Sequence, residues 1–169
     1  NLYFFFAAPI ANAVNVLVCA LVVYVGVIHL HVVEGDDVAV LAFGDRVAPA
    51  VEAAEALSAE GIEAEKHSWM PDCLILGSTG NLEKLQSFQD GLFYVQDPAA
   101  KLSVFCARLP EEENVQILDC CAAPGGKTFA AALSMQGTGT IHSCDVYPHK
   151  TALIQSGAAR LGFHNITVH

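Results

Sequence analysis

The stretch ILDCCAAPGGKTFAAAL, at residues 117–133, constrains the fold of this chain more than any other part of the sequence. An apolar run ends at an acid, a turn with one proline and two adjacent glycines follows, and an alanine-rich segment comes next. This order is typical of a β-strand that leads through a tight turn into an α-helix of an open parallel sheet. In such sheets, ligands bind beyond the carboxyl ends of the strands, where the backbone amides of a glycine turn can approach them.

Strands and helices alternate over most of the sequence from residue 34 onward. The first part predicts a β-α-β segment, with a strand at 38–44, a helix at 45–61, and two strands around a proline-marked turn within 62–76. Beyond it, the pattern predicts further strands at 92–97, 115–121, 140–146 and 163–169, and helices at 98–109, 127–136 and 148–162. Such alternation implies a partial doubly wound, mostly parallel sheet with right-handed crossovers.

Asp145 is a second feature that points to a ligand site at the glycine turn. It ends the strand predicted at 140–146, about twenty residues beyond the turn. An acid at that separation can accept hydrogen bonds from the ribose of an adenosine-containing ligand. The alternative is an ordinary β-α turn followed by a helix-capping aspartate. The turn itself matches neither a Walker A loop, which needs an earlier glycine, nor G-x-G-x-x-G.

Composition narrows the functional classes. The formal net charge is -10 and the eight bases are spread singly, so we expect weak binding to naked RNA or DNA. The six cysteines show no C-x-x-C spacing, which argues against a zinc site or a disulfide framework and favours a cytoplasmic protein with reduced thiols. Among the seven histidines only His29 and His31 share a ligand-like spacing, and no third ligand accompanies them, so no metal site is predicted.

The first 33 residues form an apolar segment without Asp, Glu, Lys or Arg. Its central part, residues 13–30, approaches the length of a membrane span. However, no basic residue precedes Arg46, and the run is rich in β-branched residues, which suit buried strands. We therefore expect buried strands here, with a membrane anchor as the alternative.

The part of the chain from about residue 54 to residue 169 resembles the middle of a bacterial ribosomal-RNA cytosine-5 methyltransferase of the Fmu/Sun type. The resemblance rests on HSWMPDCLIL, GLFYVQDPAAKLS, ILDCCAAPGGKT and IHSCDVYPHKTALIQSGAARLGFHNITV. It implies a Rossmann-like fold and S-adenosylmethionine as the cofactor, with Asp145 holding the ribose. It also implies that one continuous segment wraps the methionine end of the cofactor: Cys121, Ala122, Ala123, Pro124, Gly125, Gly126 and Lys127.

The same resemblance implies that catalysis is incomplete. That family attacks carbon 6 of cytosine with a cysteine in a later motif, which lies past the last residue of this sequence, so we assign no catalytic residue. RNA would be a partner only together with a missing half, and DNA would not be one. We expect the sheet edge after Val168 to be covered by the apolar N-terminal strands or by a second copy of the chain.

Residues 35 to about 62 are similar to the start of the C-terminal domain of 1-deoxy-D-xylulose-5-phosphate synthase. Two hypotheses follow from the two partial resemblances. The chain is a truncated or chimeric RNA cytosine-5 methyltransferase domain that binds S-adenosylmethionine, or a recombined or designed α/β protein without activity. The expected parts are an apolar segment at 1–33, a β-α-β segment at 34–80 and a partial cofactor-binding domain at 81–169.

Overall fold

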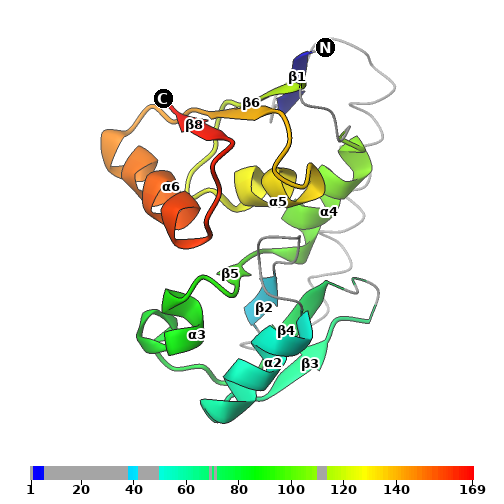
Figure 1. Cartoon of the computed structure of the whole chain (residues 1–169), viewed down its shortest axis with the longest axis vertical. Helices are drawn as coiled ribbons and strands as arrows, with labels where there is room; N and C mark the ends of the chain where they lie inside the picture. Colours follow the sequence, from blue (N-terminus) through cyan, green and yellow to red (C-terminus); the bar gives the residue numbers. More distant parts are fainter. Residues whose placement is uncertain (1, 6–37, 42–49, 69, 71, 110–113) are drawn as a thin grey trace.

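The structure is a computed structural model that describes residues 2–5, 38–41, 50–68, 70, 72–109 and 114–169. Its strands form two separate four-stranded sheets. In Figure 1 the sheet in the lower half carries α2 and α3, and the sheet in the upper half carries α4, α5 and α6. The strand at 38–41, the strands within 62–76 and all later predicted elements are present, whereas the predicted helix start at Asp45 lies outside the described residues.

The upper sheet is parallel throughout and has the order β1-β6-β7-β8. Its elements in chain order are β1 (Leu2–Phe5), β6 (Gln116–Asp119), α5 (Gly126–Ser134), β7 (Thr140–Ser143), α6 (Pro148–Arg160) and β8 (Ile166–Val168). Helices α5 and α6 touch, because a Cβ added to Gly157 would stand 2.6 Å from the Phe129 ring. They therefore cover one face of the sheet, as two successive crossovers of the same hand require. The parallel pairing of β6, β7 and β8, with a helix between successive strands, confirms the predicted mostly parallel α/β sheet.

The N-terminal strand does not lie where we expected it. β1 pairs with β6, with Leu2 opposite Gln116 and Phe5 opposite Asp119, so it covers the edge opposite to β8. In a doubly wound sheet that starts with β6, this is the position beside the first strand that a later strand would take. Within the described residues β8 pairs only with β7.

The remainder of the apolar segment, residues 6–33, lies outside the described residues, and the expectations of buried strands or a membrane anchor there stay untested. His29 and His31 also lie in this part. None of the helices in the described ranges has both the length and the apolar character needed to cross a bilayer.

The lower sheet is antiparallel, which differs from the parallel pairing expected of the whole chain. It consists of β2 (Val38–Leu41), β3 (Ala64–Lys66), β4 (Cys73–Leu76) and β5 (Tyr94–Val95), in the order β3-β4-β2-β5, with α2 (Ala50–Ala59) between β2 and β3. β4 lies between the two strands that α2 connects, so the predicted β-α-β segment is a split one. The reason is local, because the short connection from β3 to β4 allows an antiparallel neighbour but no parallel crossover.

Helix α4 (Pro98–Ala107) leads from the lower sheet to the upper one. It follows a short 3-10 helix, η1 (Leu82–Lys84), and the short helix α3 (Gln86–Gln89). Asp97 caps α4 by accepting a hydrogen bond from the Ala99 amide at 2.7 Å, and Pro98 occupies the first turn as predicted.

Arg160, at the end of α6, holds the two parts together. Its Nη1 atom donates to the carbonyl oxygens of Phe88 at 2.6 Å and Phe93 at 2.9 Å, and the guanidinium lies 3.8 Å from the centroid of the Phe88 ring. The chain passes so close that a Cβ on Gly91, which has φ +76, would stand 2.1 Å from the Arg160 carbonyl oxygen. Only glycine fits this contact.

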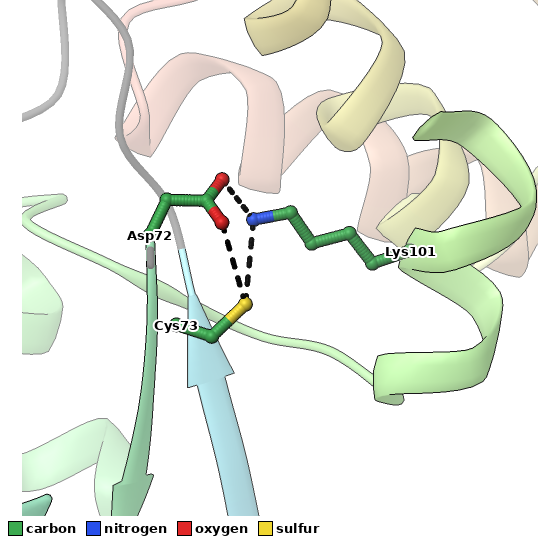
Figure 2. A network of polar contacts seen from close by, with 3 residues as sticks. All are labelled: Asp72, Cys73 and Lys101. Carbon is green, nitrogen blue, oxygen red and sulfur yellow. Dashed lines mark hydrogen bonds and ion pairs between the residues drawn. The ribbon is translucent and has the colours of Figure 1, made fainter. Parts of the chain in front are cut away.

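A polar cluster provides a second connection, which Figure 2 shows from close by. Lys101 of α4 forms an ion pair with Asp72, the residue before β4, and its Nζ atom lies 3.6 Å from Cys73 Sγ. Cys73 is fully buried, and burial raises the pKa of its thiol to about 12. The thiol is therefore protonated at neutral pH, and the cluster serves as a contact between α4 and the lower sheet rather than as a nucleophile.

Candidate functional site

The glycine turn connects β6 to α5 beyond the carboxyl end of the strand. Gly125 is the N-cap of α5 and has φ +115, and its amide donates to the Ala122 carbonyl oxygen at 2.7 Å. The turn is also attached to the chain after β7, because the Ala122 amide donates to the Cys144 carbonyl oxygen at 3.0 Å and the Cys144 amide to that of Asp119 at 2.8 Å. These bonds fix the turn against the carboxyl end of the neighbouring strand.

Both glycines of the turn lie directly against side chains of the protein. A Cβ on Gly125 would lie 2.4 Å from Cζ of Phe129, and one on Gly126 would lie 2.3 Å from Oε1 of Gln96. The protein's own side chains therefore occupy the space next to both glycines, and the assignment of Gly125 and Gly126 to a ligand site stays a prediction.

A buried cluster of three polar side chains lies beneath the turn and joins β6, α5 and β7. The Thr128 hydroxyl donates to Asp119 Oδ2 at 2.8 Å and lies 3.0 Å from Ser143 Oγ. All three side chains are at most 3% exposed, so none relies on water. Burial raises the pKa of the Asp119 carboxyl, while hydrogen bonds from Thr128 and the Cys121 amide and the charge of Lys127 act in the opposite direction.

Asp145 lies two residues beyond the end of β7, and its Oδ1 accepts a hydrogen bond from the Tyr147 amide at 3.1 Å. It is thus part of the turn into α6, and it lies at the same edge of the sheet as the glycine turn. Val146, the next residue, is 84% exposed despite its apolar side chain.

The predicted site residues of the turn, together with Asp145, differ in their access to solvent. The exposed ones are Cys121, Pro124 and Lys127; Ala122 and Gly125 are buried; Ala123, Gly126 and Asp145 are in between. The cationic side chain of Lys127 and the backbone at the start of α5 are therefore accessible to a ligand, whereas Ala122 and Gly125, which form the turn, are buried. The Ala123–Pro124 peptide bond is cis.

The thiols near Asp119 are poorly suited to nucleophilic attack. Burial raises the pKa of the Cys120 thiol, with the neighbouring Cys144, Cys121 and Asp119 adding to the effect. Burial and Asp119 likewise raise the pKa of Cys144. Because the thiolate is the reactive form, both groups are less nucleophilic at neutral pH than an ordinary cysteine.

Two cavities in the described part of the chain lie away from the glycine turn. One of about 300 Å³ adjoins the amino ends of β7 and β8 and is lined by residues such as Gly139, Thr140 and Asn165. The other, of about 150 Å³, lies between α4 and α5 next to Asp72 and Lys101. Neither of these cavities is lined by residues of the turn, so a ligand there would bind through the exposed hydrogen-bonding groups of the turn. Within the described residues there is also no cluster of three or more metal-ligating side chains.

The sequence reasoning missed two sets of residues that the fold brings together. Gln96, just after β5, packs its carboxamide against Gly126. On the sheet, Nδ1 of His142 lies 3.1 Å from Nε2 of His169, and Nε2 of His142 lies 2.8 Å from Oε1 of Gln116. No sequence spacing indicates these contacts, because each joins separate strands or helices. For Gln96, its place directly before the cap and proline of α4 is the only local signal.

Comparison with solved structures identifies the fold. The crystal structure of PH0851 matches with a TM-score of 0.75 and 19% identity, over 98% of this chain and 40% of that one. The structure of NSun6 from Pyrococcus horikoshii with SFG matches with a TM-score of 0.70 and 14% identity, over 79% of this chain and 57% of that one. The chain therefore shares the α/β fold of these two proteins, and the match to PH0851 spans nearly the whole chain.

Sequence comparison narrows the class. Residues 106–169 match the family 16S rRNA methyltransferase RsmB/F. The probable ribosomal RNA small subunit methyltransferase B of Bacillus subtilis (strain 168) is 37% identical over 106 residues, which are 63% of this chain and 23% of that protein. The corresponding enzyme of Sodalis glossinidius is 36% identical over 107 residues, 63% of this chain and 24% of that protein. The C-terminal part of this chain is thus homologous to the RsmB/F rRNA cytosine-5 methyltransferases.

The chain spans about a quarter of the length of these relatives. The comparisons do not support the second resemblance, that of residues 35 to about 62 to 1-deoxy-D-xylulose-5-phosphate synthase. In the structure this part contributes β2 and α2 to the antiparallel sheet. Because the likeness to PH0851 covers both sheets, a junction of two unrelated families is not needed to explain the fold.

Proposed function

We propose that this chain is the S-adenosylmethionine-binding part of an RNA cytosine-5 methyltransferase. The observation that carries the proposal is the glycine turn of residues 121–127, which lies at the carboxyl edge of a parallel sheet in the segment homologous to RsmB/F enzymes. The start of α5 provides backbone N–H groups and the positive end of the helix dipole, which suit the carboxylate of the cofactor's methionine part. Lys127 adds an exposed positive charge.

Asp145 is the proposed partner of the cofactor's ribose. Its carboxylate lies beyond β7, next to the strand that leads into the turn, which is where doubly wound folds hold a ribose. The Tyr147 amide fixes the position of one carboxylate oxygen. Val146 supplies an exposed apolar surface beside it, on which a purine ring can pack.

We further propose that the chain binds the cofactor without transferring its methyl group. The raised pKa values of Cys120 and Cys144 favour their thiol forms, and Cys121 belongs to the proposed cofactor turn. A net charge of -10 also disfavours RNA binding by this chain alone. In this proposal RNA is the substrate and the enzyme acts in the cytoplasm. Among the described strands β8 pairs only with β7, and its other edge is where a second copy of the chain would pair.

Isothermal titration calorimetry with S-adenosylmethionine and S-adenosylhomocysteine tests the proposal. We expect saturable binding that weakens about tenfold or more in Asp145→Asn, because a neutral amide is a poorer acceptor for two ribose hydroxyls. Asp90→Asn is the matched control, since Asp90 is an exposed acid at the end of α3 and should leave the affinity unchanged. A folded sample that binds neither ligand would refute the proposal.

Methylation is tested separately, by incubating the chain with a tritiated-methyl cofactor and ribosomal RNA. We expect no transfer of label. Incorporation into cytosine by the chain alone would contradict the proposed lack of catalysis, while leaving the proposed cofactor binding intact.

Gly125→Val, an obvious variant for this turn, is a poor test. A side chain at Gly125 would collide with Phe129, so a loss of binding could simply report a loss of structure. Substitution of the exposed Lys127 by alanine avoids this problem, and we expect a loss of affinity that shrinks at high salt.

A further inference from the structure

Three buried side-chain atoms of the described residues lack a hydrogen-bond partner: Tyr94 Oη, Gln96 Nε2 and Asn165 Oδ1. Leaving such a group unpaired is unfavourable, so each calls for an explanation. Gln96 differs from the other two in its surroundings, because it lies against the glycine turn.

The carboxamide of Gln96 is next to the first residue of α5. The point where a Cβ would stand on Gly126 is 2.3 Å from Oε1 and 3.4 Å from Nε2 of Gln96. The Gln96 residue is only 7% exposed, so solvent does not satisfy the amide group. The absence of a side chain at Gly126 is what allows Gln96 to reach this position.

Several hydrogen-bond donors gather at the start of α5, next to the Oε1 acceptor of Gln96. The first N–H groups of any α-helix have no partner within the helix, and the N-cap of α5, Gly125, provides no side-chain acceptor for them. The unpaired Nε2 of Gln96 adds two more N–H donors beside them. A ligand that brings an acceptor with negative charge would complement this arrangement, whereas a cation would not.

We propose that Gln96 is a binding residue for the cofactor, whose Nε2 donates a hydrogen bond to the carboxylate of the bound methionine moiety. This inference rests on the proposed function, and it adds a residue from outside the turn, on the segment between β5 and α4. It also gives the segment a role in ligand recognition in addition to its role in connecting the two sheets. Binding of the carboxylate would remove the unfavourable unpaired donor.

The test compares two ligands in calorimetry with the whole chain. S-adenosylhomocysteine carries the amino-acid carboxylate, and 5′-methylthioadenosine lacks it. We expect Gln96→Met to weaken S-adenosylhomocysteine binding about tenfold to a hundredfold, in line with loss of a hydrogen bond to a charged group, and to leave 5′-methylthioadenosine binding unchanged. Gln155→Met, on the exposed face of α6, is the matched control and should change neither affinity.

Gln96→Glu provides a second variant with nearly the same shape and a pH signature. At neutral pH its carboxylate repels the ligand's carboxylate, so S-adenosylhomocysteine should bind more weakly than to Gln96→Met. As the pH falls and the introduced carboxyl is protonated, it regains a donor and the affinity should partly recover. Circular dichroism of each variant verifies that it is folded.

The outcomes separate the inference from the proposed function. If the unmodified chain binds both ligands and Gln96→Met weakens both equally or neither, the role of Gln96 is refuted and cofactor binding stands. Unchanged or tighter binding of S-adenosylhomocysteine to Gln96→Glu at neutral pH also overturns it, because it would mean that the residue accepts a hydrogen bond from the ligand. If the unmodified, folded chain binds neither ligand, both proposals fall.

Discussion

Replacing Thr128 by valine removes one hydroxyl group from the buried cluster that joins β6, α5 and β7. The substitution keeps the shape of the side chain, which is 1% exposed, so its effect comes from the lost hydrogen bonds. Asp119 loses the donor at 2.8 Å and Ser143 loses its partner at 3.0 Å. A hydrogen bond to a charged group contributes about 1.5–3 kcal/mol and a neutral one about 0.5–1.5 kcal/mol, so we expect a loss of about 2–4 kcal/mol.

Thermal and urea unfolding, followed by circular dichroism at neutral pH, measure this loss. For a chain of this size each kcal/mol lowers Tm by about 2–4 °C, so Thr128→Val should unfold about 4–16 °C lower than the unmodified protein. Thr151→Val is the matched control, because its hydroxyl donates to the Pro148 carbonyl oxygen in an exposed first turn of α6. That variant should change the free energy of unfolding by less than about 0.5 kcal/mol.

The pH dependence of this loss follows from Asp119. The Thr128 bond lowers the pKa of the carboxyl, so its removal raises that pKa further and the variant is affected most where Asp119 is charged. The deficit should shrink as the pH falls toward acidic values. If Thr128→Val loses no more stability than Thr151→Val at neutral pH, the cluster does not hold the strand, the turn and the helix together as we infer.

Three further predictions concern other parts of the fold. Because burial raises the pKa of Asp119, the stability that this residue contributes is fully present below its unfolded-state pKa and is lost as the pH rises through its folded-state pKa. In urea titrations, Asp119→Asn should therefore gain stability relative to the parent as the pH is raised from acidic to neutral. A constant difference between the two proteins across that range would contradict this assignment. Arg160→Met should lower the free energy of unfolding by about 2–4 kcal/mol because two backbone carbonyl oxygens lose a charged donor, and an unchanged urea midpoint would mean that this contact does not stabilise the chain. Cys73, whose thiol is buried with a pKa of about 12, should resist iodoacetamide at pH 8 while the exposed Cys121 is modified, as read by peptide mass spectrometry; equal labelling of the two in the folded protein would disprove the burial.

Local features of the fold could be predicted from the sequence because their signals are local. The strand, glycine turn and helix around residues 117–133 follow from a run of apolar residues, a proline, two glycines and helical spacing, and all three are present. The start of α4 at Pro98 is equally direct, because proline suits the first turn of a helix. The sequence predicts the strands and the helix of the split β-α-β segment but not the antiparallel pairing of its strands. The positions of strands along the chain do not specify which strand lies between two others in the sheet.

In the candidate site, too, some features follow from the local sequence and others only from the tertiary structure. By itself the sequence determined which residues form the turn and that an acid follows the next strand, since a short chain segment sets the backbone geometry on its own. Only the tertiary structure decided that β1 lies beside β6, that Thr128 meets Asp119 and Ser143, and that Gln96 reaches Gly126. These contacts join residues from different elements, so they exist only once the strands are paired and the helices packed on them.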